Sequence, residues 1–71
     1  MPDDTRIARA AVQIWKRLHD PMYEPAEEIE VIRTMCAAEY GITICDDNGS
    51  FRLTPAELEQ AIMLAQEAPH G

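Results

Sequence analysis

The stretch DDNGS, residues 46–50, constrains the fold most, because it separates two short segments in which apolar and polar residues alternate. Asn-Gly is a strong signal for a two-residue β-hairpin loop of type I′. With Asn48 and Gly49 as that turn, Ile44 pairs with Leu53. This register puts the large apolar residues of both segments on one face, namely Ile42, Ile44, Phe51 and Leu53. The sequence therefore predicts a two-stranded antiparallel hairpin over about residues 42–54.

Two amphipathic helices are predicted before the hairpin. The first covers residues 4–19, with Asp3 or Asp4 as its cap, and its apolar residues recur at helical spacing, namely Ile7, Ala11, Ile14 and Leu18. The second covers residues 25–40, with proline in its first turn and Gly41 as a left-handed stop. One apolar stripe of this second helix consists of Ile29, Ile32, Cys36 and Tyr40.

A third helix is predicted directly after the hairpin. Thr54 and Glu57 have the spacing of a capping box, and Pro55 stands at the first helical position. The helix covers residues 55–68, before a loose tail at 69–71, and its apolar stripe consists of Leu58, Ala61, Ile62 and Ala65. Because a lone hairpin is not stable in water, the helices must cover it. We expect one α+β domain over residues 1–71 with the order α-α-β-β-α.

Length and cysteine content narrow the class of protein. A chain of 71 residues suffices for one small domain. It has no run of about 20 apolar residues that could span a bilayer, and its first residues lack the order of a signal peptide. Cys36 and Cys45 lack the spacing of a metal site, and two cysteines are too few for a typical secreted disulfide scaffold. We expect two free thiols in a cytoplasmic protein with no membrane contact.

The residues from Asp46 to Glu57 resemble an EF-hand calcium loop. Counted from the first of them, oxygen-bearing side chains occupy the ligand positions of that loop, namely Asp46, Asn48, Ser50, Thr54 and Glu57. Phe51 stands at the sixth position, where the family has glycine, and β-branched residues precede the loop where the family has a helix. The resemblance covers twelve residues and implies a calcium-binding protein, our third hypothesis. The leading expectation is a chain with no metal and no cofactor.

The sequence offers little support for catalysis. His19 and Asp20 are adjacent at the end of the first predicted helix, where a favourable helix-end charge is the commoner role of such residues. No nucleophile has a plausible base nearby, and the chain has no glycine-rich phosphate loop and no HExxH spacing. We expect a protein that is not an enzyme.

Basic residues gather in the first predicted helix, opposite its apolar stripe, namely Arg6, Arg9, Lys16 and Arg17. Such a strip either binds a phosphate backbone or an acidic partner, or forms a solvated face with local ion pairs. The formal net charge of −7 repels nucleic acid, and the element order is not that of a winged helix-turn-helix. A small DNA-associated transcriptional regulator that uses this strip is therefore our second hypothesis.

The middle of the chain is the acidic part, with seven acidic side chains and one basic side chain between residues 21 and 50. Four of the acidic residues gather at the start of the second helix, namely Glu24, Glu27, Glu28 and Glu30. Beside them runs a second apolar strip of Val31, Met35 and Ala38, which together with Met63 on the outer side of the third helix is the candidate contact surface. The alternative is that the hairpin covers this strip.

These features support our leading hypothesis, a non-enzymatic protein-protein interaction module. The glutamates and the second apolar strip would dock on a basic surface of a bacterial partner protein, as small acidic inhibitors or adaptors encoded by phages and plasmids do. A homodimer through the same strip is the other arrangement that the sequence leaves open.

Overall fold

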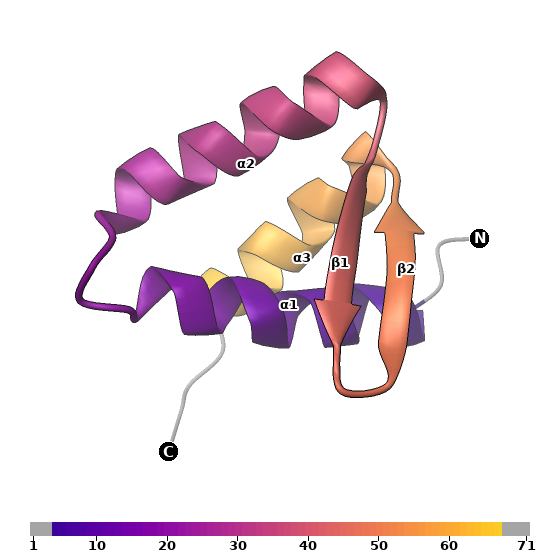
Figure 1. Cartoon of the computed structure of the whole chain (residues 1–71), viewed down its shortest axis with the longest axis horizontal. Helices are drawn as coiled ribbons and strands as arrows, with labels where there is room; N and C mark the ends of the chain where they lie inside the picture. Colours follow the sequence, from indigo (N-terminus) through magenta and orange to yellow (C-terminus); the bar gives the residue numbers. More distant parts are fainter. Residues whose placement is uncertain (1–3, 68–71) are drawn as a thin grey trace.

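A computed structural model describes residues 4–67 and shows the expected α+β order of helix, helix, strand, strand and helix (Figure 1). The five elements are α1 (Asp4–Leu18), α2 (Pro25–Glu39), β1 (Ile42–Asp46), β2 (Gly49–Leu53) and α3 (Pro55–Glu67). The hairpin stands across α1, and α2 leads from the end of α1 to the start of β1. The predicted cap Asp3, the end of the third helix at residue 68 and the tail 69–71 lie outside the described residues.

The amphipathic pattern of α1 folds as predicted. Asp4 lies in its first turn and two basic residues lie in its last turn, where each charge is favourable to the helix dipole. Its buried face consists of Ile7, Ala10, Ala11, Ile14 and Leu18. This face packs most extensively against α3, whose predicted stripe of Leu58, Ala61, Ile62 and Ala65 is buried throughout.

The end of α2 differs from the prediction. The residue in the left-handed conformation is Tyr40, with φ 55° and ψ 33°, and not Gly41. The backbone N–H groups of Tyr40 and Gly41 both donate to the carbonyl of Cys36, which closes the last turn one residue early. The Tyr40 side chain therefore leaves the buried stripe of α2 and is 85% exposed.

Gly41 is still required, for a reason of space. A Cβ atom at this position would lie 2.8 Å from the carbonyl oxygen of Leu53 and 2.9 Å from Nε of Arg52. The start of β1 can approach the end of β2 this closely only because residue 41 has no side chain.

The hairpin forms, but its register is shifted by two residues from the one predicted. Ile44 pairs with Phe51 and Asp46 pairs with Gly49, so Asp47 and Asn48 are the loop residues. In the described chain Tyr40 is the only non-glycine residue with positive φ, which excludes a type I′ turn at Asn48. The Asp46 carboxylate accepts the backbone N–H of Asn48 at 2.9 Å, and this side-chain turn sets the reversal one residue earlier.

The shift leaves the two faces of the hairpin as predicted, because moving a strand by two residues restores the same side chains to the same face. Ile44 and Leu53 are buried, while Ile42 and Phe51 pack at the margin of the core. Directly after β2, the predicted capping box of α3 is present: Glu57 N–H donates to Thr54 Oγ1 at 3.2 Å, and Thr54 N–H donates to Glu57 Oε1 at 3.0 Å.

The pairing also decides which backbone groups face outward. A pair that closes a two-residue loop is hydrogen-bonded, so hydrogen-bonded pairs alternate from Asp46–Gly49 along the ladder. The N–H and C=O groups of the intervening residues, Thr43 and Cys45 on β1 and Ser50 and Arg52 on β2, therefore point away from the partner strand.

Candidate protein-interaction surface

The second apolar strip of α2 is exposed. Val31 is 50% exposed and Met35 is 56% exposed, and Ala38 on the same strip is also exposed. The alternative in which the hairpin covers this strip is therefore not the one that the chain adopts. The buried side of α2 consists of Ile29, Ile32 and Cys36, which join the core with α1 and α3.

The glutamates at the start of α2 divide into two groups. Glu24, Glu27 and Glu30 are exposed, and Glu30 lies 4.0 Å from Arg33. Glu28 is only 7% exposed, and its carboxylate lies 3.3 Å from Nε of Arg17. Because Glu28 is engaged within the chain, three of the four predicted glutamates remain beside the apolar strip.

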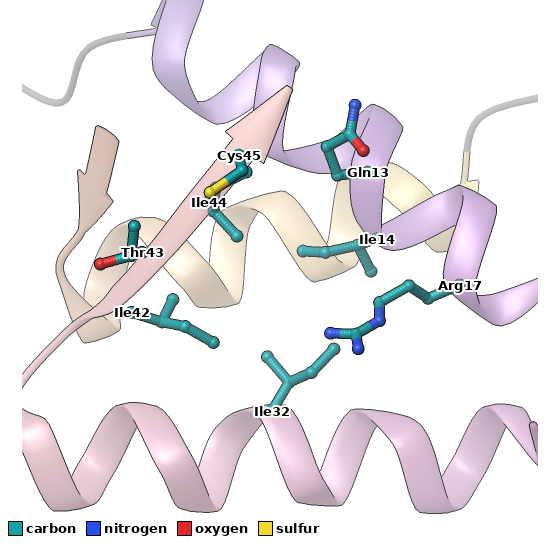
Figure 2. Close-up of a pocket in the computed structure, with 8 residues that line it drawn as sticks. All are labelled: Gln13, Ile14, Arg17, Ile32, Ile42, Thr43, Ile44 and Cys45. Atoms are coloured by element: carbon teal, nitrogen blue, oxygen red, sulfur yellow. The ribbon is translucent and has the colours of Figure 1, made fainter. Parts of the chain in front are cut away.

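A pocket of about 320 Å³ lies between α1, α2 and β1 (Figure 2). Its apolar wall consists of Ile14, Ile32, Ile42 and Ile44, and the guanidinium of Arg17 points toward the same space. Thr43 and Cys45 also line it, so four consecutive residues of β1 border the pocket. No pattern in the sequence indicates this pocket, although any two-stranded hairpin leaves two open edges.

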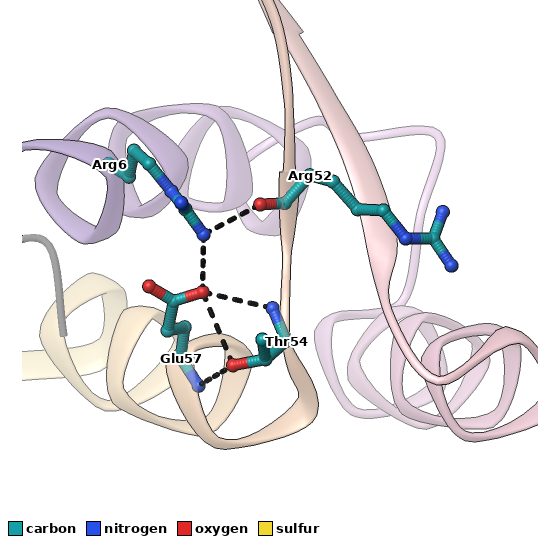
Figure 3. Close-up of polar contacts among 4 residues, drawn as sticks. All are labelled: Arg6, Arg52, Thr54 and Glu57. Carbon is teal, nitrogen blue, oxygen red and sulfur yellow. Dashed lines mark hydrogen bonds and ion pairs between the residues drawn. The ribbon is translucent and has the colours of Figure 1, made fainter.

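The predicted basic strip of α1 is used largely within the chain. The Nη2 atom of Arg6 donates both to Glu57 Oε1 and to the carbonyl of Arg52, the latter at 2.8 Å. These two bonds join α1 to α3 and β2 (Figure 3). Arg17 pairs with Glu28 on α2, as described above, and Lys16 is exposed. Arg6 and Arg17 thus contact two different elements, and the predicted strip is not a single outer face.

Arg9 holds the tip of the hairpin. Its Nε and Nη2 atoms donate to the two carboxylate oxygens of Asp46 at 2.7 and 2.6 Å, and its guanidinium lies 4.5 Å from the ring centroid of Phe51. The hydrogen bond from Arg9 holds the pKa of Asp46 below its ordinary value.

The residues of the calcium-loop resemblance are not gathered at one point. Asp46 pairs with Gly49, the first residue of β2, and Glu57 follows the last residue of β2. At the usual rise β2 spans roughly 13 Å between these ends. Each carboxylate is held by a different arginine of α1. Within residues 4–67 no three His, Cys, Asp or Glu side chains cluster as they would to hold a metal ion.

The candidate polar pair His19 and Asp20 does not act as a unit. The His19 ring stacks on Trp15 with centroids 4.2 Å apart, and Nδ1 lies 2.9 Å from the carbonyl of Trp15. Asp20 instead accepts the backbone N–H of Met22 at 2.9 Å. Both cysteines are free thiols: Cys36 is buried, which raises the pKa of its thiol, and Cys45 is exposed.

Comparison with protein families, with curated proteins and with solved structures found no match to this chain. Among α1, α2 and α3, no helix has the length and apolar character that a membrane span requires.

Proposed function

We propose that this chain is a non-enzymatic interaction module that binds a basic surface of a partner protein through the outer face of α2. The α2 contact surface consists of Glu24, Glu27, Glu30, Val31, Met35 and Ala38. The proposal is supported most by one observation, the exposed apolar strip of Val31 and Met35 with acidic side chains beside it. Exposed apolar strips with a polar rim are typical of protein contact surfaces.

The two parts of the α2 contact surface have different roles in this proposal. The apolar strip supplies affinity when it is removed from water, and a flexible methionine adapts to an uneven partner surface. The glutamates, on a chain of formal net charge −7, increase the rate of association with a basic partner. Because both cysteines are free, we propose that the module acts in the cytoplasm, where thiols stay reduced.

A pair of matched variants tests this proposal. Val31 on α2 is 50% exposed, and Val12 on α1 is 52% exposed. We expect Val31→Lys to reduce capture of a specific protein from a lysate of the source cells at least about tenfold, as loss of a central apolar contact does. Val12→Lys should leave capture within about twofold of the unchanged chain. Equal capture by both variants would remove the α2 contact surface from the proposal.

Salt and size give the remaining readouts. The association rate of the captured protein should fall several-fold between about 50 and 500 mM salt, because the steering charges are screened. If the purified chain is instead a dimer that Val31→Lys converts to a monomer, the α2 contact surface serves self-association and not a basic partner.

A further inference from the structure

One edge of the hairpin is open. Outside the β1–β2 ladder, the N–H groups of Thr43 and Cys45 donate to no described residue, and their C=O groups accept from none. The corresponding edge of β2 is partly covered, because Arg6 donates to the outward carbonyl of Arg52. Unpaired strand edges are the places where a further strand can add.

The open edge lies beside an apolar recess. The pocket of about 320 Å³ runs along four consecutive residues of β1, and Ile14 and Ile32 form its floor (Figure 2). A strand added next to β1 would lie about 4.8 Å from it and would point every second side chain into this recess. The edge would supply backbone hydrogen bonds and the recess would supply apolar contacts, which are the two components of β-strand addition.

We propose that this edge binds an extended segment of a partner protein as a third, antiparallel strand. The segment has aliphatic residues at alternate positions, which enter the recess, and basic residues at its ends. Exposed Glu39 and Asp47 stand near the two ends of β1, and each has a cation nearby, Arg52 and Lys16 respectively. The basic ends are therefore supported by the formal net charge of −7 on the whole chain. Arg17, which lines the recess, is already paired with Glu28.

A second folded copy of this chain does not fit the same place. Its own helices would lie under its β1, on the side of the sheet where α1 and α2 of the first copy form the floor of the recess. Adjacent strands are separated by about 4.8 Å and a helix is about 10 Å wide, so the two sets of helices would overlap. An isolated strand carries no helices and avoids this overlap.

The test uses wild-type protein and two synthetic peptides, acetyl-Lys-Val-Thr-Ile-Lys-amide and its counterpart with glutamate in place of lysine. We expect the lysine peptide to slow hydrogen exchange at the Thr43 and Cys45 amides at least about tenfold at saturation and to leave Ser50 and Arg52 unchanged. At low salt it should bind at least about fivefold tighter than the glutamate peptide.

Proline variants give the matched comparison, because proline removes an outward N–H without removing a bond between β1 and β2. Thr43→Pro on β1 should weaken binding of the lysine peptide at least about tenfold, while Ser50→Pro on β2 should leave it within about twofold. If Thr43→Pro does not fold, Gln13→Trp, which fills the recess from α1, takes its place with the same expected loss.

Several results would overturn strand addition at β1. Two of them concern place: slower exchange at the Ser50 and Arg52 amides in place of Thr43 and Cys45, and peptide-induced changes in exchange confined to Val31 and Met35. Two concern the ligand: no response to either peptide at millimolar concentration, and slower exchange at Thr43 that depends on the concentration of the protein alone. The last would indicate a second copy. The strand-addition site is separate from the α2 contact surface. Loss of partner capture by Val31→Lys, together with normal binding of the lysine peptide by Thr43→Pro, would therefore overturn this inference and retain the proposed function.

Discussion

At the scale of single residues, the polar contacts of this chain are of two kinds: local caps and turns, and ion pairs that join distant elements. Thr54 and Glu57 are three residues apart, so the capping box follows from local geometry alone. The partners of Arg6 and Arg9 are 51 and 37 residues away in the chain, and no periodicity in α1 indicates them. The sequence therefore predicted where the arginines emerge from the helix but not what they bind.

The ion pair between Arg9 and Asp46 predicts a pH dependence. The pKa of Asp46 is lower in the folded chain than in the unfolded chain, so in acid the unfolded chain binds more protons. The ion pair therefore contributes its full stability above the unfolded pKa of about 3.9. This contribution is lost as the pH falls through the lower, folded value. Asp46→Asn keeps an oxygen for the Asn48 N–H and removes the charge.

Urea unfolding between about pH 2 and 7 checks this. The stability difference between wild type and Asp46→Asn should be largest near neutral pH and should shrink steadily below about pH 4. Asp47→Asn, at the exposed neighbouring position, is the control for the loss of one negative charge. A difference that stays constant across the range would show that the charge of Asp46 does not contribute.

The two hairpin glycines predict a contrast in tolerance. A Cβ at Gly41 would meet the Leu53 carbonyl oxygen at 2.8 Å, whereas a Cβ at Gly49 would meet nothing within 4 Å. Both residues have positive φ, so Gly41→Ala adds a backbone clash to the conformational cost that Gly49→Ala also carries. We expect Gly41→Ala to lower the free energy of unfolding by about 1–3 kcal/mol, and more than Gly49→Ala does. Equal losses in urea melts would contradict the close approach.

At the scale of elements, type and order were predictable, and the ends were less so. Apolar periodicity identified α1, α2, the two strands and α3, because each element buries one face and the period of that face is a property of the backbone. The hairpin register was wrong by two residues because the face criterion cannot detect an even shift. The register instead follows the side-chain turn at Asp46, and Arg9 of α1 holds the same carboxylate.

The left-handed residue at the end of α2 predicts a stabilising substitution. An L-residue in this conformation costs about 1–2 kcal/mol, and Tyr40 has little burial to offset the cost. Tyr40→Gly should raise the free energy of unfolding by about 0.5–1 kcal/mol, which corresponds to roughly 2–8 °C in Tm for a domain of this size. Tyr40→Ala removes the same side chain but keeps the conformational cost, so its Tm should stay near the wild-type value. A lower Tm for Tyr40→Gly would indicate that the tyrosine side chain stabilises the end of α2.

At the scale of the whole molecule, the helices and the hairpin share one set of buried side chains. Ile14 of α1, Ile32 of α2, Leu53 of β2 and Ile62 of α3 all belong to one core cluster. Charged contacts follow the same plan, since α1 reaches the other elements through Arg6, Arg9 and Arg17. The hairpin should therefore unfold together with the helices and not before them.

Leu53→Ala tests this cooperativity, because Leu53 is the fully buried residue of β2 and is 0% exposed. The substitution should cost about 2–5 kcal/mol, a large part of the roughly 4–11 kcal/mol expected for a chain of this length. Far-UV circular dichroism reports the helices, and near-UV circular dichroism reports Trp15 at the margin of the core. We expect the melting midpoints from both signals to fall by the same amount. Met63→Ala, at a residue 57% exposed on α3, should change stability by less than about 0.5 kcal/mol. A variant whose helices keep the wild-type midpoint would instead make the hairpin an accessory to a self-sufficient helical core, and strand addition at β1 would then act on an element that opens independently of the rest.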